Sequence, residues 1–189
     1  GLQTVGNNFY YFNASGKMQT GWQGINNKWY YFDNGGYGQK SWQMIAGNTY
    51  YFLDNYQMAT GFQEISGNTY FFSTGVMNIY GKTYYEGYMV TGWLPLGNDW
   101  YYFSTWDGAM YKGFRNEKEG KVYYKTDGSK CYGEQRINEK WYYFDPATGA
   151  MQTGFVDLGS KTVYYSTTGS MCYGEKQING KWYYFEPVT

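Results

Sequence analysis

The sequence has no histidine, few prolines and no excess of either charge. Fifteen Lys and Arg residues balance fifteen Asp and Glu residues among 189, so the formal net charge is zero. A neutral chain has no general electrostatic attraction to nucleic acid or to an anionic membrane surface. The chain also has no apolar run of membrane-spanning length and no signal-peptide pattern at its start. We therefore expect no nucleic-acid partner and no membrane insertion.

The usual components of an active site are missing as well. Histidine is the most versatile acid–base group and the commonest metal ligand, and a catalytic triad of the common type needs it. The carboxylates, such as Asp107, Glu119 and Asp145, are scattered over turn-like segments and form no recurring pair suited to hydrolysis. We expect no catalytic residue, no metal site and no cofactor in this chain.

Aromatic residues, in contrast, are abundant. The chain has 26 Tyr, 12 Phe and 8 Trp, which make up 24% of it, beside 27 Gly. They recur in similar blocks of about 20 residues, a period typical of repeat architectures. We expect a single repeat domain over 1–189 and, since the sequence starts inside the pattern at Gly1, interpret it as part of a longer surface or secreted protein. The blocks begin near residues 1, 21, 41, 61, 78, 92, 113, 133, 154 and 174.

Each block has the pattern of a β-hairpin. In the block from 21, the segment "GWQGI" is followed by the turn "NN" and then by "WYYF", which is rich in strand-forming aromatics. The Asn-Gly pair at 179–180 is a strong signal for a tight primed turn. An isolated two-stranded hairpin is marginally stable in water, so these units must pack on their neighbours. The sequence predicts an all-β solenoid of stacked two-stranded β-hairpin repeats.

Strand alternation predicts where the aromatic side chains point. If the "NN" pair forms the turn, Trp22 lies opposite Tyr31, and Trp29 lies on the same face as both. Tyr30 and Phe32 then point to the other face. One face supplies the interior of the repeat, and the other presents the two indoles at the junction with the next block.

This pattern of a "GW", a turn, a "WYYF" and a loop ending in "GxMxTG" is best preserved in 21–32, 92–103 and 141–154. It resembles the cell-wall-binding, or choline-binding, repeats of Gram-positive surface proteins and phage lysins. Similar repeats occur in the glucan-binding regions of glucansucrases and in clostridial toxins. The resemblance implies a non-catalytic, secreted and cell-wall-associated module that recognises choline on teichoic acids. Binding of α-glucan or another wall polysaccharide, or a purely structural stalk, stay open as alternatives.

In choline-binding members the resemblance implies an aromatic cage between successive hairpins. The cage takes the "GW" aromatic and the "WYY" Trp from one repeat and a Tyr from the next, and it attracts a quaternary ammonium through cation–π interaction. A loop Met, such as Met58 or Met110, can line it. Carried over to this sequence, the ligand-binding residues are Trp22, Trp29 and Tyr51 in a first cage, Trp93, Trp100 and Tyr124 in a second, and Trp42 in a third candidate where Thr49 replaces the second Trp and Phe71 lies beyond.

The blocks from 113 onward depart from the pattern. Glu134 and Glu175 replace the "GW" aromatic in the two blocks that keep Trp141 and Trp182. The blocks from 113 and 154, which alternate with them, have Phe114 and Phe155 in the "GW" position, but Val122 and Val163 before their Tyr pairs. No complete three-aromatic cage can be assembled here, so this part is either structural or binds another ligand, such as a sugar.

The two cysteines, Cys131 and Cys172, occupy equivalent loop positions two blocks apart. Equivalent positions two hairpins apart in a solenoid exceed the Cα separation of about 7 Å that a disulfide tolerates. We expect two free thiols that act as small hydrophobic side chains.

Overall fold

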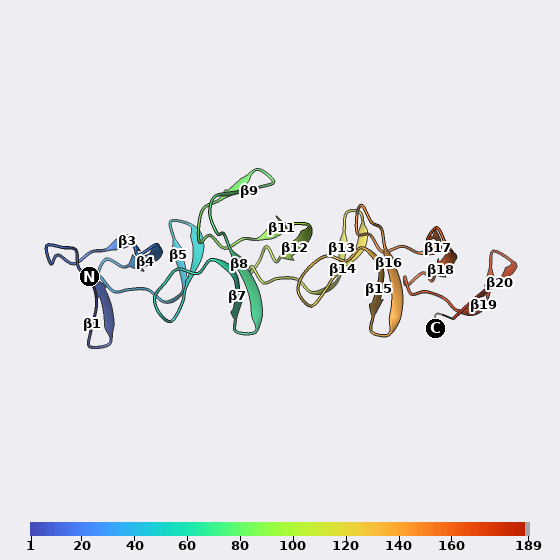
Figure 1. Cartoon of the computed structure of the whole chain (residues 1–189), viewed down its shortest axis with the longest axis horizontal. Coiled ribbons are helices and arrows are strands. Elements are labelled where there is room, and N and C mark those ends of the chain that lie inside the picture. The colour runs from blue at the N-terminus through green and yellow to red at the C-terminus, as the bar shows by residue number, and fades with distance from the viewer. Residues whose placement is uncertain (188–189) are drawn as a thin grey trace. The chain divides into compact units, whose positions relative to one another are not determined.

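The computed structural model describes residues 1–187, and these residues form only strands, turns and loops (Figure 1). The predicted all-β fold of hairpin repeats is confirmed. Within the described residues, no helix is long and apolar enough to cross a membrane. Between residues 1 and 187, twenty strands pair into ten two-stranded sheets, each formed by strands that follow one another in the chain. The strands are β1 (Leu2–Val5), β2 (Asn8–Tyr11), β3 (Gly21–Ile25), β4 (Lys28–Phe32), β5 (Ser41–Ile45), β6 (Asn48–Phe52), β7 (Gly61–Ile65), β8 (Asn68–Phe72), β9 (Met77–Ile79), β10 (Lys82–Tyr84), β11 (Gly92–Leu96), β12 (Asp99–Phe103), β13 (Gly113–Glu117), β14 (Gly120–Tyr124), β15 (Gly133–Ile137), β16 (Lys140–Phe144), β17 (Gly154–Asp157), β18 (Thr162–Tyr165), β19 (Gly174–Ile178) and β20 (Lys181–Phe185).

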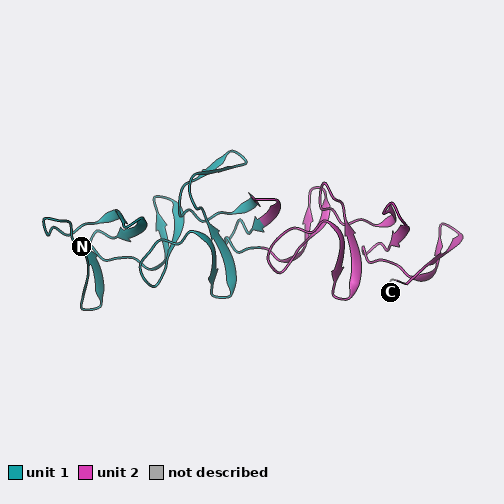
Figure 2. Ribbon diagram, in the orientation of Figure 1, with its two compact units in different colours: residues 1–95, 102–110 teal, residues 96–101, 111–189 magenta. Residues whose placement is uncertain are grey.

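The chain divides into two compact units, which Figure 2 shows in different colours. The first unit comprises residues 1–95 and 102–110, and the second comprises residues 96–101 and 111–189. Each unit is described by itself below.

The hairpin of β3 and β4 has the geometry that its sequence predicts. Asn26 and Asn27 have φ angles of 50° and 59°, and positive φ at both central residues defines the primed turn that matches the twist of two antiparallel strands. The register places Trp22 opposite Tyr31, as predicted, and Trp29 opposite Gly24. Local turn chemistry therefore fixes the face on which each indole lies.

In most repeats a closing loop follows the second strand and ties its hairpin to the preceding one. Phe52 forms an isolated bridge to Met58 in its own loop, and the Met58 N–H donates to the Trp29 carbonyl with 2.8 Å between N and O. In the second unit the Met171 N–H donates in the same way to the Trp141 carbonyl, again at 2.8 Å. Contacts between neighbouring repeats are the stabilising interactions expected of hairpins too small to fold alone.

In seven of the described hairpins, the last residue of the second strand forms the core. These side chains are at most 1% exposed, because each is enclosed by its own closing loop and by aromatic residues of adjacent hairpins. In the first unit they are Phe32, Phe52, Phe72 and Phe103; in the second they are Tyr124, Phe144 and Tyr165.

The irregular stretch between 61 and 91 has a simple structural explanation. Phe72 forms its bridge not with a residue a few positions later but with Met89, and the Met89 N–H donates to the Thr49 carbonyl at 2.9 Å. Met89 thus has the role that Met58 has one block earlier. The segment that the sequence sets apart as a short block from 78 therefore lies inside the closing loop of the block from 61, where β9 and β10 form an inserted hairpin.

A charged network lies buried in the second unit. The Glu117 side chain is 2% exposed and accepts from Arg115 Nη1 at 3.0 Å and from Lys130 Nζ at 3.1 Å. The Tyr124 hydroxyl also donates to this carboxylate, at 2.8 Å. Next to Lys130, the free thiol of Cys131 is buried, which raises its pKa. Cys172 is the second free thiol.

Candidate functional site

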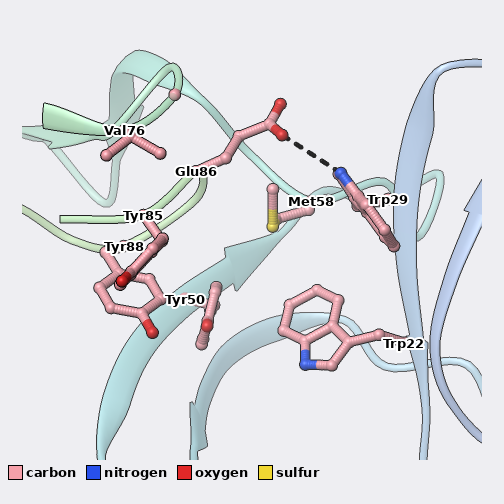
Figure 3. A pocket seen from close by; sticks show the side chains of 9 residues that line it. Trp22, Trp29, Tyr50, Met58, Val76, Tyr85, Glu86 and Tyr88 are labelled. Atoms are coloured by element: carbon pink, nitrogen blue, oxygen red, sulfur yellow. Dashed lines mark hydrogen bonds between the residues drawn. The ribbon is translucent and has the colours of Figure 1, made fainter.

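A pocket of about 380 Å³ lies within the first unit (Figure 3). Its volume falls in the range of small-molecule sites, about 300–1,000 Å³. Three parts of the chain form it: the β3–β4 hairpin, the following hairpin with its closing loop, and the loop that carries the inserted hairpin. The lining residues are mostly aromatic: Trp22, Trp29, Tyr50, Met58, Gly75, Val76, Tyr85, Glu86 and Tyr88.

The two indoles form one corner of the pocket. Trp22 on β3 and Trp29 on β4 have ring centroids 6.3 Å apart and an interplanar angle of 87°. Trp22 is held by Tyr31, whose centroid is 5.2 Å away. Opposite Trp29, the residue is Gly24, and a Cβ there would lie 3.4 Å from the indole ring. The small residue lets the Trp29 ring lie across its own hairpin, and Trp29 remains 41% exposed.

Tyr50 on β6 provides the next wall. Its ring centroid is 4.8 Å from that of Trp22 and 5.4 Å from that of Tyr88, with interplanar angles of 57° and 86°. Burial, together with a hydrogen bond to the Tyr88 hydroxyl, raises the pKa of Tyr50 above its ordinary value. Tyr50, like a tyrosine of ordinary pKa, is neutral at physiological pH and presents an uncharged ring.

The third aromatic residue of this cluster differs from the predicted one. The sequence predicts Tyr51, but the structure places Tyr50 beside Trp22 and packs Tyr51 against Trp42, with 5.0 Å between centroids. The physical reason is strand alternation: Tyr51 lies opposite Trp42 in its own hairpin and shares its face. Its neighbour Tyr50 points the other way, toward the preceding hairpin.

The inserted segment contributes a carboxylate to the wall of the pocket. Trp29 Nε1 donates to Glu86 Oε2 at 3.2 Å, the contact drawn as a dashed line in Figure 3. Tyr85 and Tyr88 stand beside each other, with centroids 5.6 Å apart. Neither Glu86 nor these two tyrosines are predicted from the sequence, although the segment "GYMVTG" that follows matches the loop ending of the other blocks. That match signals that the preceding residues belong to a closing loop.

The preceding junction shows why this pocket is open. Phe9, which has the place of Trp29 in the first hairpin, is covered by Tyr56, with centroids 4.2 Å apart and nearly parallel rings. Gly38 makes room for that stacking, since a Cβ there would lie 2.8 Å from the Phe9 ring. At the next junction Met58 takes the place of Gly38, and Gly87 takes the place of Tyr56. Gly87 has no side chain that could stack as Tyr56 does, and Trp29 remains 41% exposed.

The third candidate, Trp42, has a partly similar environment. Its ring packs against Tyr70 and Phe72, with centroid distances of 4.8 and 5.8 Å. The predicted partner Phe71 is instead opposite Phe62 in its own hairpin, which is the same one-residue shift as at Tyr50. Thr49 provides no second indole, so fewer aromatic faces meet at this junction.

The second predicted cage is distributed over both units. Trp93 belongs to the first unit, where its ring centroid is 5.2 Å from that of Tyr102. Trp100 and Tyr124 belong to the second unit, so a cage of these three residues stays a prediction. Tyr124 is fully buried and has the core position of Phe52, so its environment differs from that of an exposed cage wall.

In the block from 113 a cation of the chain itself lies over the "GW" aromatic. Lys121 has the strand position of Trp29, and its Nζ lies 4.7 Å from the centroid of Phe114. In the block from 133, Glu134 forms an ion pair with Lys161 at 3.9 Å, while Trp141 has the position of Trp29. In the part of the chain that the structure describes, no three His, Cys, Asp or Glu side chains gather to hold a metal ion.

Comparison with known families identifies the class of protein that this fold and site define. The profile of the choline-binding repeat matches residues 1–37, 19–58 and 111–154, which together make up more than half of the chain. A related cell wall binding repeat matches residues 60–77, 91–110 and 176–187. The chain belongs to the choline-binding repeat family and is a cell-wall-binding repeat module.

Solved structures agree with this assignment. Choline binding protein F from Streptococcus pneumoniae, crystallised in the presence of a peptidoglycan analogue, is 29% identical with a TM-score of 0.74; the match covers 91% of this chain and 57% of that one. CbpJ from Streptococcus pneumoniae TIGR4 is 29% identical with a TM-score of 0.50, covering 98% and 85%. The autolysin LytC from Streptococcus pneumoniae, at 21% identity and a TM-score of 0.56 over 100% and 48%, shares the fold. A comparison with curated protein sequences gives no match.

Proposed function

We propose that this module binds the choline groups of teichoic acids, and that it thereby attaches a secreted protein to the bacterial cell wall without catalysing a reaction. The observation that carries the proposal is the pocket in the first unit, where Trp22, Trp29 and Tyr50 meet at steep angles beside the Glu86 carboxylate.

This geometry suits a quaternary ammonium group. Such a cation has no N–H to donate, so it cannot be recognised by hydrogen bonds, but it is attracted to the faces of aromatic rings within about 6 Å of their centroids. The Trp22 centroid is 6.3 Å from that of Trp29 and 4.8 Å from that of Tyr50. Because all three rings line the same pocket, a single cation in the pocket can contact all three.

The expected affinity is modest. Each cation–π contact contributes about 0.5–2 kcal/mol, so three rings contribute a few kcal/mol, and a free energy of about 4 kcal/mol corresponds to a Kd near 1 mM. Teichoic acid presents many choline groups on one polymer. Several weak sites on a repeat module then gain strength through multivalency.

The comparisons support the proposal at the level of the family. The matched profile is that of a choline-binding repeat, and choline binding protein F, at 29% identity, was crystallised in the presence of a peptidoglycan analogue. This chain spans 57% of the length of that relative. Choline binding, location at the cell wall and the absence of catalysis are therefore proposed for this chain.

The test is titration of the chain with choline chloride by isothermal calorimetry, with dextran as a parallel ligand. Trp29→Ala removes an indole that is 41% exposed and lies outside the buried core. The matched control is Trp106→Ala, which removes an indole that is 95% exposed and does not line the pocket. We expect Trp29→Ala to weaken choline binding about tenfold and Trp106→Ala to leave it unchanged.

Two results would count against the proposal. One is the absence of any choline heat at millimolar concentration, combined with heat from dextran. The other is equal choline affinity of the Trp29→Ala and Trp106→Ala variants, because the pocket in the first unit would then take no part in binding.

A further inference from the structure

The loop that closes the pocket is positioned by its own backbone hydrogen bonds. The Gly87 N–H donates to the Ser73 carbonyl at 2.8 Å, and the Ser73 N–H donates to the Tyr88 carbonyl at 2.9 Å. Ser73, directly after β8, is fully buried. The inserted hairpin of β9 and β10 is thus joined to the repeat at a fixed point, and the short turn from Tyr85 to Tyr88 stands at the pocket.

Packing between Gly87 and Met58 sets the position of that turn. Gly87 has a φ of +81°, and a Cβ on it would lie 2.2 Å from Met58 Sδ. The backbone of the turn therefore rests directly on the thioether of the preceding loop. This contact leaves the adjacent Glu86 side chain at the mouth of the pocket, where its Oε2 accepts from Trp29 Nε1 at 3.2 Å (Figure 3).

An acidic residue in this loop position behaves differently in another block. Asp107 precedes Gly108 as Glu86 precedes Gly87, but its carboxylate accepts from the Ala109 N–H of its own loop at 3.1 Å. The longer Glu86 side chain instead reaches a different hairpin, 57 positions away in the sequence. Its charge is directed at the aromatic pocket and is not used to stabilise its own turn.

We propose that Glu86 increases the selectivity of this pocket for a cationic ligand over a neutral ligand of the same shape. The inference rests on the proposed function, since it concerns the same pocket. The aromatic faces contact both kinds of ligand and already favour the cation through cation–π interaction; a carboxylate at the pocket rim adds a charge–charge attraction that only the cation experiences. Because Glu86 is exposed, this attraction weakens as salt is added.

The experiment compares choline with its neutral isostere 3,3-dimethylbutan-1-ol. Binding is followed by the ¹H–¹⁵N resonance of the Trp29 indole, which is assigned by its disappearance in Trp29→Phe and reports on this pocket alone. The variant is Glu86→Gln, whose amide oxygen can still accept from Trp29 Nε1. Glu119→Gln is the matched control, because it removes the same charge from an exposed turn of the second unit.

We expect the wild-type chain to prefer choline to the alcohol. At low salt, Glu86→Gln should lose about five- to tenfold in choline affinity while its affinity for the alcohol changes less than about twofold. This difference should shrink when salt is raised to about 0.3 M, where the Debye length is well below 10 Å. Glu119→Gln should bind both ligands like the wild-type chain.

Three results would overturn the inference. Unchanged choline affinity in Glu86→Gln would show that the carboxylate contributes no selectivity. An equal loss for choline and the alcohol would show that Glu86 only maintains the shape of the pocket. If choline does not shift the Trp29 resonance of the wild-type chain at all, the proposed function fails together with the inference; in the first two cases the proposed function stands.

Discussion

Replacing Lys130 with methionine should destabilise the second unit, because it removes one partner of a buried carboxylate. Lys130 Nζ lies 3.1 Å from Glu117 Oε2, and the two side chains are 8% and 2% exposed. The other oxygen, Oε1, keeps its donors from Arg115 and Tyr124. Methionine should preserve the packing. The alkyl chain of Lys130 lies against Gly149, where a Cβ would be 2.5 Å from Lys130 Cε, and other blocks have a Met in the position of Lys130.

The size of the effect follows from this geometry. Removing one partner of a buried ion pair costs about 3–5 kcal/mol when the remaining charge is left without compensation. Glu117 keeps two donors in this variant, so we expect a loss of about 2–3 kcal/mol in the free energy of unfolding. The double variant Glu117→Gln with Lys130→Met removes both charges and retains an acceptor for the Tyr124 hydroxyl. It should be more stable than Lys130→Met alone.

Hydrogen exchange at a single amide measures the effect locally, which is necessary because a repeat protein need not unfold in one step. The Cys131 N–H donates to the Tyr123 carbonyl at 2.8 Å and lies next to the substituted residue. A loss of 2–3 kcal/mol corresponds to a decrease of about 30- to 150-fold in its protection factor. Protection within about threefold of wild type in Lys130→Met, or a double variant less protected than the single one, would refute the reasoning.

Two further predictions concern the pocket loop and acid stability. Gly87→Ala should weaken choline binding severalfold, because its Cβ would lie 2.2 Å from Met58 Sδ; Gly47→Ala, with a similar φ of +78° and no atom within 4 Å, should not. Calorimetry compares the two, and equal affinities would contradict the prediction. Hydrogen bonds from the backbone N–H and side-chain hydroxyl of Thr148 lower the pKa of Asp145. A carboxyl group whose pKa is lower in the folded state than in the unfolded state stabilises the fold. This contribution is complete above the unfolded-state pKa of about 3.9 and is lost as the pH falls through the folded-state pKa. In Asp145→Asn, the urea concentration at the midpoint of unfolding should therefore decrease less steeply below about pH 4 than in the wild-type chain. The same pH dependence in both chains would contradict the stabilising role of the Asp145 carboxylate.

The features inside each hairpin could be predicted from the sequence because they depend on neighbouring residues. The two-residue turn after Ile25 and the pairing of Trp22 with Tyr31 follow from turn chemistry and strand alternation, and the structure confirms both. Burial of Phe32 follows from the same alternation. These relations need no knowledge of how one block meets the next.

The contacts between hairpins could not be predicted in the same way. The sequence predicts Tyr51 beside Trp22, whereas the structure places Tyr50 there. Tyr51 pairs with Trp42 on one face of its hairpin, and Tyr50 lies on the other face, which meets the preceding hairpin. The sequence also misses Glu86, which reaches Trp29 only because an insertion brings two distant segments together. Periodicity carries no signal for a residue that the insertion places outside the repeat.

The block from 113 provides the final prediction, since it has an aromatic corner similar to that of the pocket, with Phe114 at the position of Trp22 and a lysine at the position of Trp29. Phe114 packs on Tyr142 of the next hairpin at 5.3 Å, as Trp22 packs on Tyr50. The Met151 N–H donates to the Lys121 carbonyl, as Met58 donates to Trp29. The Lys121 ammonium, 4.7 Å from the Phe114 centroid, supplies from within the chain the cation–π contact that we propose for choline in the first unit.

Lys121→Trp should therefore create a choline site in the second unit. The substitution removes the internal cation and adds a ring where the first unit has Trp29, so the number of choline molecules bound per chain should rise by one in a calorimetric titration. Lys121→Met is the control, because it removes the ammonium without adding a ring and should leave the stoichiometry unchanged. If Lys121→Trp folds as the wild type does and its choline stoichiometry does not rise, the prediction is wrong: adding the second indole is not sufficient to create a site in the block from 113. If both variants gain a site, removal of the lysine charge is sufficient, and the internal cation alone keeps the site closed.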